Sequence, residues 1–317
     1  MVSFVYVVDL FAGGGGFSRG FAEAGYKVAL GVEIDANAAR TYSYNFPRAV
    51  VLQEDVASIS YREIERYAGK VDIVIGGSPC EPFTATNPRR MEDPLDRLYT
   101  DPLGQLTLHF IRLVGEVQPK VFVLENVPGI AQEPLREALE REFKRVGFDE
   151  IYFNVLLAER YGTPSHRRRV FISNLRISPK PVGMVTVRRA LSGLPPVDSG
   201  FPNHESVTLS KSKAERIANV RPGEALMKFR GASGIYGNFV RLKWDEIAPT
   251  VMGSRRFIHP EENRLLTVRE QARLMGFPDD HVFFGPKDSQ FNQIGEAVPP
   301  PLAKAIAEHI KNILKVR

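Results

Sequence analysis

The chain has 317 residues, 43% of them hydrophobic and 25% charged, so it can bury a core in one or two domains and is not a disordered protein. Its net charge of +5 is compatible with a polyanionic partner but does not establish one. A single cysteine, Cys80, excludes an intramolecular disulfide and a thiolate-rich metal site, and no stretch approaches the roughly 20 apolar residues that cross a bilayer, so we expect a cytoplasmic protein with no metal and no membrane segment.

The first two thirds of the chain alternate between strand-like and helix-like segments. Continuous apolar runs predict buried strands, and segments of about ten residues between them predict helices. In chain order, strands are expected over 2–10, 28–34, 71–75, 121–124, 151–157 and 170–172, with a short strand before Asp55, and helices over 17–24, 36–45, 106–117 and 133–145. This alternation predicts an α/β fold with a doubly wound, mostly parallel sheet.

The character of the sequence changes after Asn174. Segments become short and are separated by proline and glycine, which predicts a second, smaller and irregular domain over 175–288. The tail, 301–314, has apolar residues at helical spacing on one face. We therefore expect 1–174 plus 289–317 to form the larger domain, with the tail helix packed against it.

A glycine-rich loop follows the first predicted strand and opens a helix, in the run from Asp9 to Gly20. Glycines there allow a ligand to approach the backbone closely. Ser18 occupies the last glycine position of the strict dinucleotide pattern, which argues against a nicotinamide cofactor. Glu33 ends the second strand, where an acid can bind ribose hydroxyls, and Asp55 could hold an adenine amino group; a solvated loop carboxylate is the alternative for each.

Three further segments place chemistry at the carboxyl edge of the predicted sheet. Cys80 lies between two prolines after one strand, Glu125 ends another, and Arg167 and Arg169 precede a third. A thiolate, a carboxylic acid and paired arginines suit attack on an electron-poor ring, and nearby arginines would favour the thiolate. A lone cysteine that serves as a small buried hydrophobe is the alternative.

In these segments the chain resembles the C5-cytosine DNA methyltransferase family. The matching pieces occur in the family's usual order: 9–20, 79–80, 125–127, 167–169, 264–279 and 293–300. The resemblance implies a Rossmann-like methyltransferase fold with a smaller target-recognition domain. It implies that Cys80 adds to C6 of a flipped-out cytosine, that Glu125 protonates N3, that Arg169 holds O2 and that Arg167 supports the active-site loop.

The resemblance also implies the cofactor and the partners. S-adenosylmethionine would donate the methyl group, double-stranded DNA would be the substrate, the enzyme would be a monomer, and a cognate restriction endonuclease could accompany it. The residues expected at the cofactor are Phe11, Ala12, Gly13, Gly15, Glu33, Ile34, Asp55, Val56, Pro79, Glu296, Ala297 and Val298.

The chain departs from the family pattern at three positions. Glu81 and Glu296 stand where the family usually has amides, and Ser165 stands where it usually has glutamine. By resemblance, both glutamates lie near the methyl-donor end of the cofactor. One of them could retain a proton, one could stabilise the sulfonium cation, or both could reflect drift within the family.

Two other functions share parts of this pattern. A tRNA cytosine-5 methyltransferase on the same scaffold would keep the same catalytic residues, and a catalytically silent nucleic-acid-binding protein would lose some of them. Residues that could meet phosphates are Arg89, Arg90 and Arg97 in the segment 84–104, which aligns with the loop that closes over DNA, and Lys211, Lys213, Arg216, Arg221, Lys228, Arg230, Arg241 and Lys243 in the smaller domain. Solvated surface charge is the alternative for these cations.

Overall fold

Seven strands from the first part of the chain form one sheet. The computed structural model describes residues 5–85, 87–231 and 234–315. In chain order the strands are β1 (Tyr6–Leu10), β2 (Lys27–Val32), β3 (Val50–Leu52), β4 (Ile73–Gly77), β5 (Val121–Asn126), β6 (Tyr152–Leu157) and β7 (Arg168–Ser173), and their spatial order is β3-β2-β1-β4-β5-β7-β6. The first five strands are parallel, and β7 runs antiparallel to both neighbours. The expected mostly parallel sheet is confirmed; positions 2–4 of the first predicted strand lie outside the described residues.

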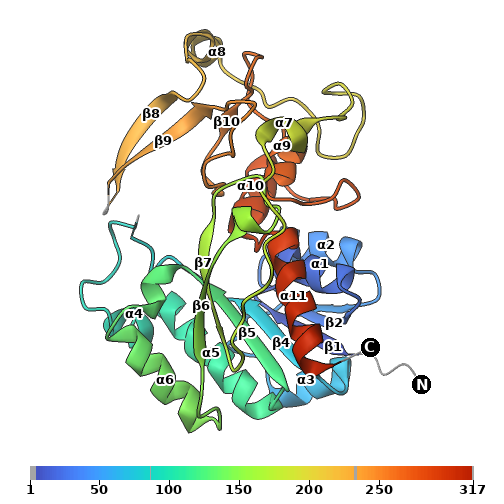
Figure 1. Cartoon of the computed structure of the whole chain (residues 1–317), viewed down its shortest axis with the longest axis vertical. Helices are drawn as coiled ribbons and strands as arrows, with labels where there is room; N and C mark the ends of the chain where they lie inside the picture. The colour runs from blue at the N-terminus through green and yellow to red at the C-terminus, as the bar shows by residue number, and fades with distance from the viewer. Residues whose placement is uncertain (1–4, 86, 232–233, 316–317) are drawn as a thin grey trace.

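Helices cover both faces of this sheet because its central strands are buried on both sides. Helices α1 (Gly16–Glu23), α2 (Ala36–Asn45) and α11 (Pro300–Leu314) lie on one face, and α3 (Tyr61–Ala68), α5 (Pro102–Val117) and α6 (Leu135–Arg145) lie on the other (Figure 1). The short α4 (Asp96–Tyr99) precedes α5, and the turns η1 (Pro128–Ala131) and η2 (Ala158–Arg160) follow β5 and β6. Helix α3 was not predicted, although its capping box of Ser60 and Glu63 is a start signal in the sequence.

The tail helix packs back against the first helix of the chain, as its apolar stripe predicted. Leu302, Ile306 and Ile310 of α11 are buried in the same core as Phe17 and Phe21 of α1. A Cβ atom at Gly20 would lie 2.4 Å from Cβ of Ala303, so the two helices meet closely at this glycine.

The second region contains more regular structure than the sequence predicted. Its sheet has the order β10-β9-β8, with β8 (Ala225–Gly231) and β9 (Gly234–Arg241) antiparallel and β10 (Phe257–Ile258) parallel to β9. The helices are α7 (Val187–Leu191), α8 (Lys211–Ala218), α9 (Val268–Leu274) and α10 (Lys287–Glu296). Frequent glycines and prolines hid these short elements, since periodicity needs longer segments to be visible.

Two cores meet at the end of α10. Phe291 and Ile294 pack with Val187, Phe257 and other residues of the second region, whereas the chain from Val298 onward packs with the large sheet. In Figure 1 the α9–α10 segment accordingly lies between the small sheet above and the large sheet below. The division into domains at 174 and 289 stays a prediction.

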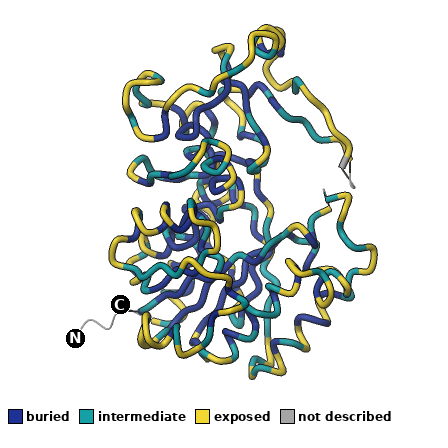
Figure 2. The backbone as a smooth tube through the Cα atoms, turned by 180° about the vertical axis from the view of Figure 1, so that it is seen from behind, coloured by how far each residue is buried: buried dark blue, intermediate teal, exposed yellow. Residues whose placement is uncertain are grey.

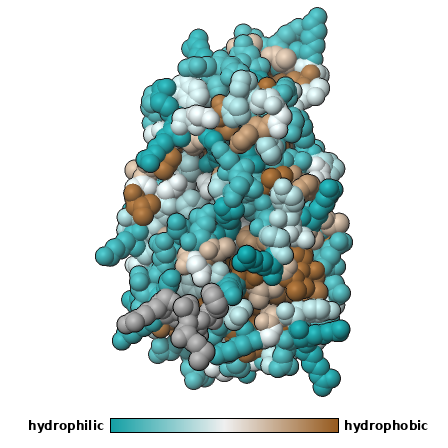
Figure 3. Space-filling view, turned by 90° about the vertical axis from the view of Figure 1, so that its right-hand side faces the viewer, coloured by the Kyte–Doolittle hydropathy of each residue, from teal (hydrophilic) through white to brown (hydrophobic). Residues whose placement is uncertain are grey.

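Burial follows the same two regions. Figure 2 shows the strands of the large sheet buried, whereas most of the β8–β9 hairpin is half-buried or exposed. Figure 3 shows that the face on the right of Figure 1 is mainly hydrophilic, with its hydrophobic residues in separate groups. Within the described ranges, no helix is both long and apolar enough to cross a membrane.

Candidate active site

The sequence segments with chemical character meet at one edge of the large sheet. The chain leaves β1 to form β2 on one side and returns to form β4 on the other, so the loops after β1 and β4 diverge at this point. Ligands of open α/β sheets bind outside the carboxyl ends of the strands at such a switch point. The glycine-rich loop follows β1, and Cys80 follows β4.

The glycine-rich loop is fixed to the end of β2 by hydrogen bonds. The backbone N–H of Gly13 donates to Glu33 Oε2 over 2.7 Å, and the N–H of Ala12 donates to the Val32 carbonyl over 2.9 Å. Phe11 and Gly13 have positive φ angles of 62° and 52°, and no described atom lies within 4 Å of the position that a Cβ at Gly13 would occupy. The loop therefore presents open backbone next to a fixed carboxylate.

Gly15 has a different role from Gly13. Its φ is +87°, and a Cβ there would lie 2.4 Å from the Phe46 ring, so this glycine lets the start of α1 pack against the chain after α2.

The other residues expected near adenosine follow β2 and β3. Glu33 accepts a second hydrogen bond from the Asp35 N–H over 2.8 Å, and burial raises its pKa. Ile34 beside it leaves 65% of its surface exposed, which is unusual for an apolar side chain next to a buried loop. Asp55 is exposed and accepts from the Ala57 N–H, whereas Val56 is buried in the core.

The C-terminal motif reaches the same loop from the far end of the sequence. A Cβ at Gly16 would lie 2.4 Å from the Val298 carbonyl oxygen and 3.0 Å from the Ala297 Cβ, so this segment lies directly against the start of α1. His281 Nε2 and the Gly14 carbonyl are hydrogen-bonded over 2.8 Å. The fold thus joins the loop to segments more than 250 residues away.

The Cys80 loop is held in place by its neighbours. Asn126, at the end of β5, donates from Nδ2 to both the carbonyl and the Oγ of Ser78, over 3.1 and 3.0 Å. Ser78 Oγ also shares a hydrogen bond with Thr107 Oγ1 over 2.9 Å. The Cys80 carbonyl accepts from the N–H groups of Phe83 and Thr84. The half-buried turn of Pro79 and Cys80 is therefore fixed on both sides.

Glu125 and Arg169 form a close ion pair beside this loop. Arg169 Nε lies 2.9 Å from Glu125 Oε1, and both side chains are largely buried. The contact is not aligned as a hydrogen bond, and Glu125 Oε1 has no hydrogen-bond partner among the described residues. The ion pair therefore compensates the buried charge of Glu125 and leaves its Oε1 free to accept an aligned hydrogen bond.

Arg167 faces a different set of groups, although it is only two residues away. It is 2% exposed and donates to the carbonyl oxygens of Val251, Gly295 and Glu296, over 3.3, 2.9 and 3.2 Å. Burial lowers the pKa of its guanidinium to about 9. Its Nε has no hydrogen-bond partner in the described part of the chain. Arg167 thus joins the start of β7 to the end of α10 and to the second region.

The thiol of Cys80 is not ionised by its arginines in this form of the protein. Burial raises its pKa to about 11, and Glu81 and Glu125 act in the same direction. Arg169 and Arg167 lower the pKa by less. The expectation that the arginines favour the thiolate had the correct sign, but it omitted the larger effect of burial.

Three carboxylates act on Glu296 at the cradle, which comprises the loops after β1, β2 and β4 and the end of α10. Burial, followed by the charges of Glu81, Glu33 and Asp35, raises the pKa of Glu296 to about 7, and Arg167 opposes this shift. The side chains of Glu81 and Glu296 both keep exposed surface.

A buried acid network supports the cradle from below. Ser18 Oγ donates to Asp9 Oδ2 over 2.6 Å and shares a hydrogen bond with the Tyr42 hydroxyl at the same distance. Burial raises the pKa of Asp9 to about 7. The serine at the last glycine position of the dinucleotide pattern therefore has a structural role under the loop.

The fold brings most of the expected site residues to this edge. Four of the expected residues, Ala12, Gly15, Val56 and Val298, are themselves buried and pack into the protein interior. The sequence assigned no role to Asn126, Thr107 or His281, which fix the loops. Only Asn126 carried a signal, because it adjoins Glu125 in the same motif; the hydrogen bonds of the other two depend on the tertiary structure.

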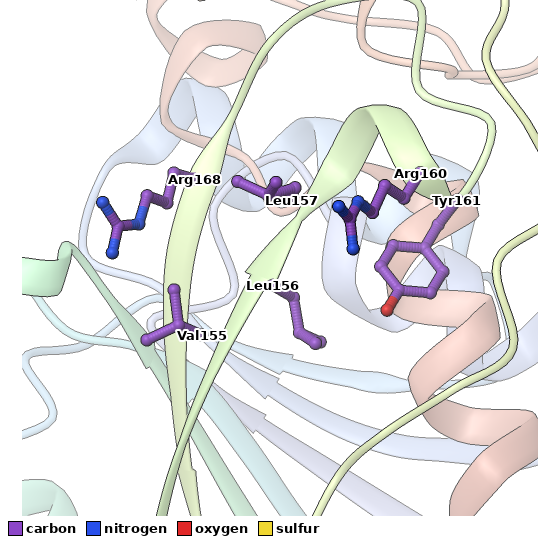
Figure 4. Close-up of a pocket in the computed structure, with 6 residues that line it drawn as sticks. All are labelled: Val155, Leu156, Leu157, Arg160, Tyr161 and Arg168. Carbon is purple, nitrogen blue, oxygen red and sulfur yellow. The ribbon is translucent and has the colours of Figure 1, made fainter.

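A separate hollow of about 340 Å³ is lined by the end of β6, by η2 and by Arg168 at the start of β7. Figure 4 shows Val155, Leu156 and Leu157 around it, with Arg160 and Arg168 well apart. Side chains alternate along a strand, so Arg168 points away from the site of its neighbours Arg167 and Arg169. This hollow has no converging polar groups, and we assign the chemistry to the sheet edge instead.

Two of the cations expected at phosphates bind carbonyl oxygens of the protein itself. Arg241 is 4% exposed and donates to the carbonyl oxygens of Ile217, Val220, His259 and Glu262, so its expected contact with phosphate is wrong. Arg97 donates to the carbonyl oxygens of Met91 and Glu92 within its own loop.

Two of the exposed cations lie on the β8–β9 hairpin. Lys228 and Arg230 lie there among the exposed apolar side chains of Met227, Phe229 and Ile235. Figures 1 and 2 both show β8 and β9 extending from the small sheet toward the loop that follows β4, on the same side of the molecule.

Comparison with known proteins adds the family. A family model for C-5 cytosine-specific DNA methylases matches residues 5–312. M.MJ0563P, a candidate type II methyltransferase of Methanocaldococcus jannaschii, is 45% identical over 97% of this chain and 99% of its own. The type II methyltransferase M1.HphI of Haemophilus parahaemolyticus is 36% identical over 96% of this chain and 86% of its own.

Solved structures agree with the fold. The chain is similar to the crystal structure of a candidate DNA modification methyltransferase from an E. coli prophage, with a TM-score of 0.80, 32% identity and coverage of 98% of this chain and 99% of the other. A mutant of Spodoptera frugiperda DNMT2, 17% identical over 98% of this chain and 99% of its own, has a TM-score of 0.66 and supports the fold alone.

Proposed function

Because this chain belongs to the C-5 cytosine-specific DNA methylase family, we propose that it transfers a methyl group from S-adenosylmethionine to C5 of cytosine in a short double-stranded DNA sequence. The observation that carries the proposal is the meeting of the Cys80 thiol with the Glu125–Arg169 pair at the carboxyl edge of the sheet. Glu125 Oε1, which accepts no hydrogen bond from the described residues, suits a ligand with a polar ring edge.

The cradle fits the proposed cofactor. Open backbone at Gly13 gives room for a ligand, the fixed carboxylate of Glu33 can accept from ribose hydroxyls, and exposed Ile34 can pack against an adenine ring. Asp55 and the segment 297–298 would complete the contacts. When bound, S-adenosylmethionine supplies an electrophilic methyl group.

The residues of the chain then act on the cytosine. The Cys80 sulfur forms a bond to C6 while the proton of its thiol passes, by way of the Glu125 carboxylate, to N3, and electron density moves to C5. Arg169 binds O2, and Arg167 fixes the end of α10 in place through its hydrogen bond to the Gly295 carbonyl. After C5 takes the methyl group, its proton is lost, the bond from C6 to sulfur breaks, and the ring is restored.

Free Cys80 is a neutral thiol in this scheme, which protects it until substrate arrives. The base must leave the helix to reach the thiol, because a stacked cytosine presents its ring edge and not its face. We propose that the β8–β9 hairpin and the loop after β4 contact the DNA, that the enzyme acts as a monomer, and that it is the modification partner of a restriction endonuclease.

Trapping with 5-fluorocytosine tests the reaction. Fluorine at C5 cannot leave as a proton does, so Cys80 should remain bonded to C6 after methyl transfer. A random-sequence duplex pool that contains 5-fluorocytosine should give a complex that survives denaturant and requires S-adenosylmethionine. Failure with every DNA but success with tRNA that contains the same base would transfer the assignment to the tRNA enzyme. Bisulfite sequencing of a plasmid propagated with the gene would identify the target.

A further inference from the structure

A buried histidine between two of the matching segments supports the glycine-rich loop. His281 lies outside the segments that carry the family resemblance on either side of it, 264–279 and 293–300. We propose that His281 is a positioning residue that orders the glycine-rich loop before the cofactor binds, so that it sets cofactor affinity and takes no part in the chemical step. The inference rests on the proposed function, because it assumes that the loop binds S-adenosylmethionine.

The hydrogen bond of His281 has a defined direction. Its Nε2 lies 2.8 Å from the carbonyl oxygen of Gly14, and a carbonyl oxygen can only accept. Burial lowers the pKa of His281 to about 3, so the ring is neutral near pH 7 and carries its one proton on Nε2. The imidazole is therefore a constant donor to the loop and does not change its charge near neutral pH.

This hydrogen bond holds one edge of a peptide plane whose other edge is also held. The carbonyl of Gly14 and the N–H of Gly15 belong to the same planar unit and point in opposite directions. The Gly15 N–H donates to the Ala12 carbonyl over 2.9 Å, and His281 binds the carbonyl edge. Since both edges are bonded, the plane cannot rotate without the loss of a hydrogen bond.

The loop needs this support because of its composition. Residues 13–16 are four glycines in succession, and glycine loses more backbone freedom than any other residue when it is fixed in one conformation. A ligand that had to order the loop would bind more weakly by that cost. A loop that is ordered beforehand therefore raises affinity for the ligand, and it leaves the reactivity of the bound ligand unchanged.

The donor is itself held from both regions of the protein. The carbonyl of His281 accepts from Arg269 Nη2 over 2.8 Å, and the Phe283 ring centroid lies 5.0 Å from that of the imidazole. The N–H of Val282 donates to Asn45 Oδ1 over 3.0 Å, and its carbonyl accepts from Asn45 Nδ2 over 2.8 Å. Arg269 lies on α9 in the second region and Asn45 on α2 beside the large sheet, so the imidazole has a fixed support on each side.

Two substitutions separate the donor from the ring. His281→Phe keeps an aromatic ring among aromatic neighbours and removes the donor, whereas His281→Gln keeps an N–H donor on a side chain of similar reach. Tyr26→Phe is the matched control, because it removes a hydroxyl that donates to the buried carbonyl of Ala307 over 3.0 Å, beyond the other end of α1.

Two measurements on these proteins need no methyl transfer. Titration calorimetry with S-adenosylmethionine and with its product, S-adenosylhomocysteine, gives the affinity for each ligand. Hydrogen exchange followed by mass spectrometry gives the order of the loop, residues 11–16, in the unliganded protein. Steady-state kinetics then separates KM for the cofactor from kcat.

For His281→Phe, we expect the affinity for both ligands to fall about tenfold and exchange in the unliganded loop to become about tenfold faster. KM for S-adenosylmethionine should rise by the same factor, while kcat at saturating cofactor should stay within about twofold of the wild type. His281→Gln should restore most of the affinity, and Tyr26→Phe should match the wild type in all three measurements.

The contrary results are distinct. Unchanged affinity in folded His281→Phe, or a fall in kcat without a rise in KM, would overturn the positioning role and leave the transfer reaction in place. If folded wild type bound neither ligand, the proposed function would fall together with the inference. Loop exchange at the rate of an unprotected chain in the unliganded wild type would also overturn the inference, so poor folding of a variant cannot conceal the answer.

Discussion

The edge of the large sheet and the β8–β9 hairpin differ in how their polar groups are held. At the sheet edge, Glu125, Arg167 and Ser78 are buried, and their partners lie on other strands, helices and loops. On the hairpin, Lys228 and Arg230 are exposed beside apolar side chains. The first arrangement fixes groups in place before a ligand binds, and the second leaves them free to adapt.

This difference matches the demands of two tasks. Bond formation needs groups held to within fractions of an ångström, and burial shifts their pKa values as a consequence. Contact with a long polyanion needs cations at a surface, where each adds a modest and salt-dependent amount of affinity. Burial therefore distinguishes a group for chemistry from a group for recognition, and Arg241 shows that it can also reveal a purely structural cation.

The sharpest test of the sheet edge is Cys80→Ala. Since the bond from sulfur to C6 is what activates C5, we expect methyl transfer to fall by about a thousandfold or more. Incorporation of tritiated methyl groups into unmethylated plasmid DNA measures the loss. Thermal unfolding and cofactor binding should stay close to the wild type, and residual activity above a few per cent would remove Cys80 from its role.

The second test asks whether a buried cation in the second region is as important for stability as the buried groups at the sheet edge. Arg241→Met leaves at least four carbonyl oxygens without their donor, and we expect a loss of about 3 kcal/mol in the free energy of unfolding. Urea unfolding followed by circular dichroism measures it. Arg230→Met, in the same region but exposed, should change stability by less than about 0.5 kcal/mol. Equal effects of the two substitutions on stability would contradict the distinction between a buried structural cation and an exposed one.

The third test addresses recognition alone. Replacing Lys228 and Arg230 together by alanine should weaken DNA binding about tenfold near physiological salt and reduce the slope of log affinity against log salt by about 2. Fluorescence anisotropy with a labelled duplex at several salt concentrations measures both. Lys70→Ala, an exposed cation at the opposite edge of the sheet, is the control. A reduced slope in the control, or an unchanged slope in the double variant, would contradict the proposed contact between the hairpin and DNA.

The smallest effect concerns pH at the sheet edge. With a pKa raised to about 11, the Cys80 thiol should react with iodoacetamide about tenfold faster for each pH unit from 7 to 10. Mass spectrometry of quenched samples follows the reaction. In urea the reaction rate of the same thiol should level off above its ordinary pKa near 8.5. A rate in the folded protein that levels off below pH 9 would show that the arginines outweigh burial.

Much of the fold could be predicted because its signals are local. Apolar runs gave the strands of the large sheet, and the order of the short motifs placed Cys80, Glu125 and the glycine loop at its carboxyl edge. The amphipathic tail predicted its own burial against the first region. Each of these features depends on residues close together in the chain, where periodicity and motif spacing carry the information.

What the sequence left open depends on distances between remote segments. Arg167 and Arg169 are near neighbours in one motif, yet one binds backbone carbonyls of the second region and the other pairs with Glu125. Arg241 reads as a surface cation until the packing around it is known. Likewise, the raised pKa of Glu296 comes from burial and from carboxylates on two other loops. Burial and electrostatic energy are properties of the assembled structure, so the sequence by itself determined which groups are present, and the tertiary structure decided what each one faces.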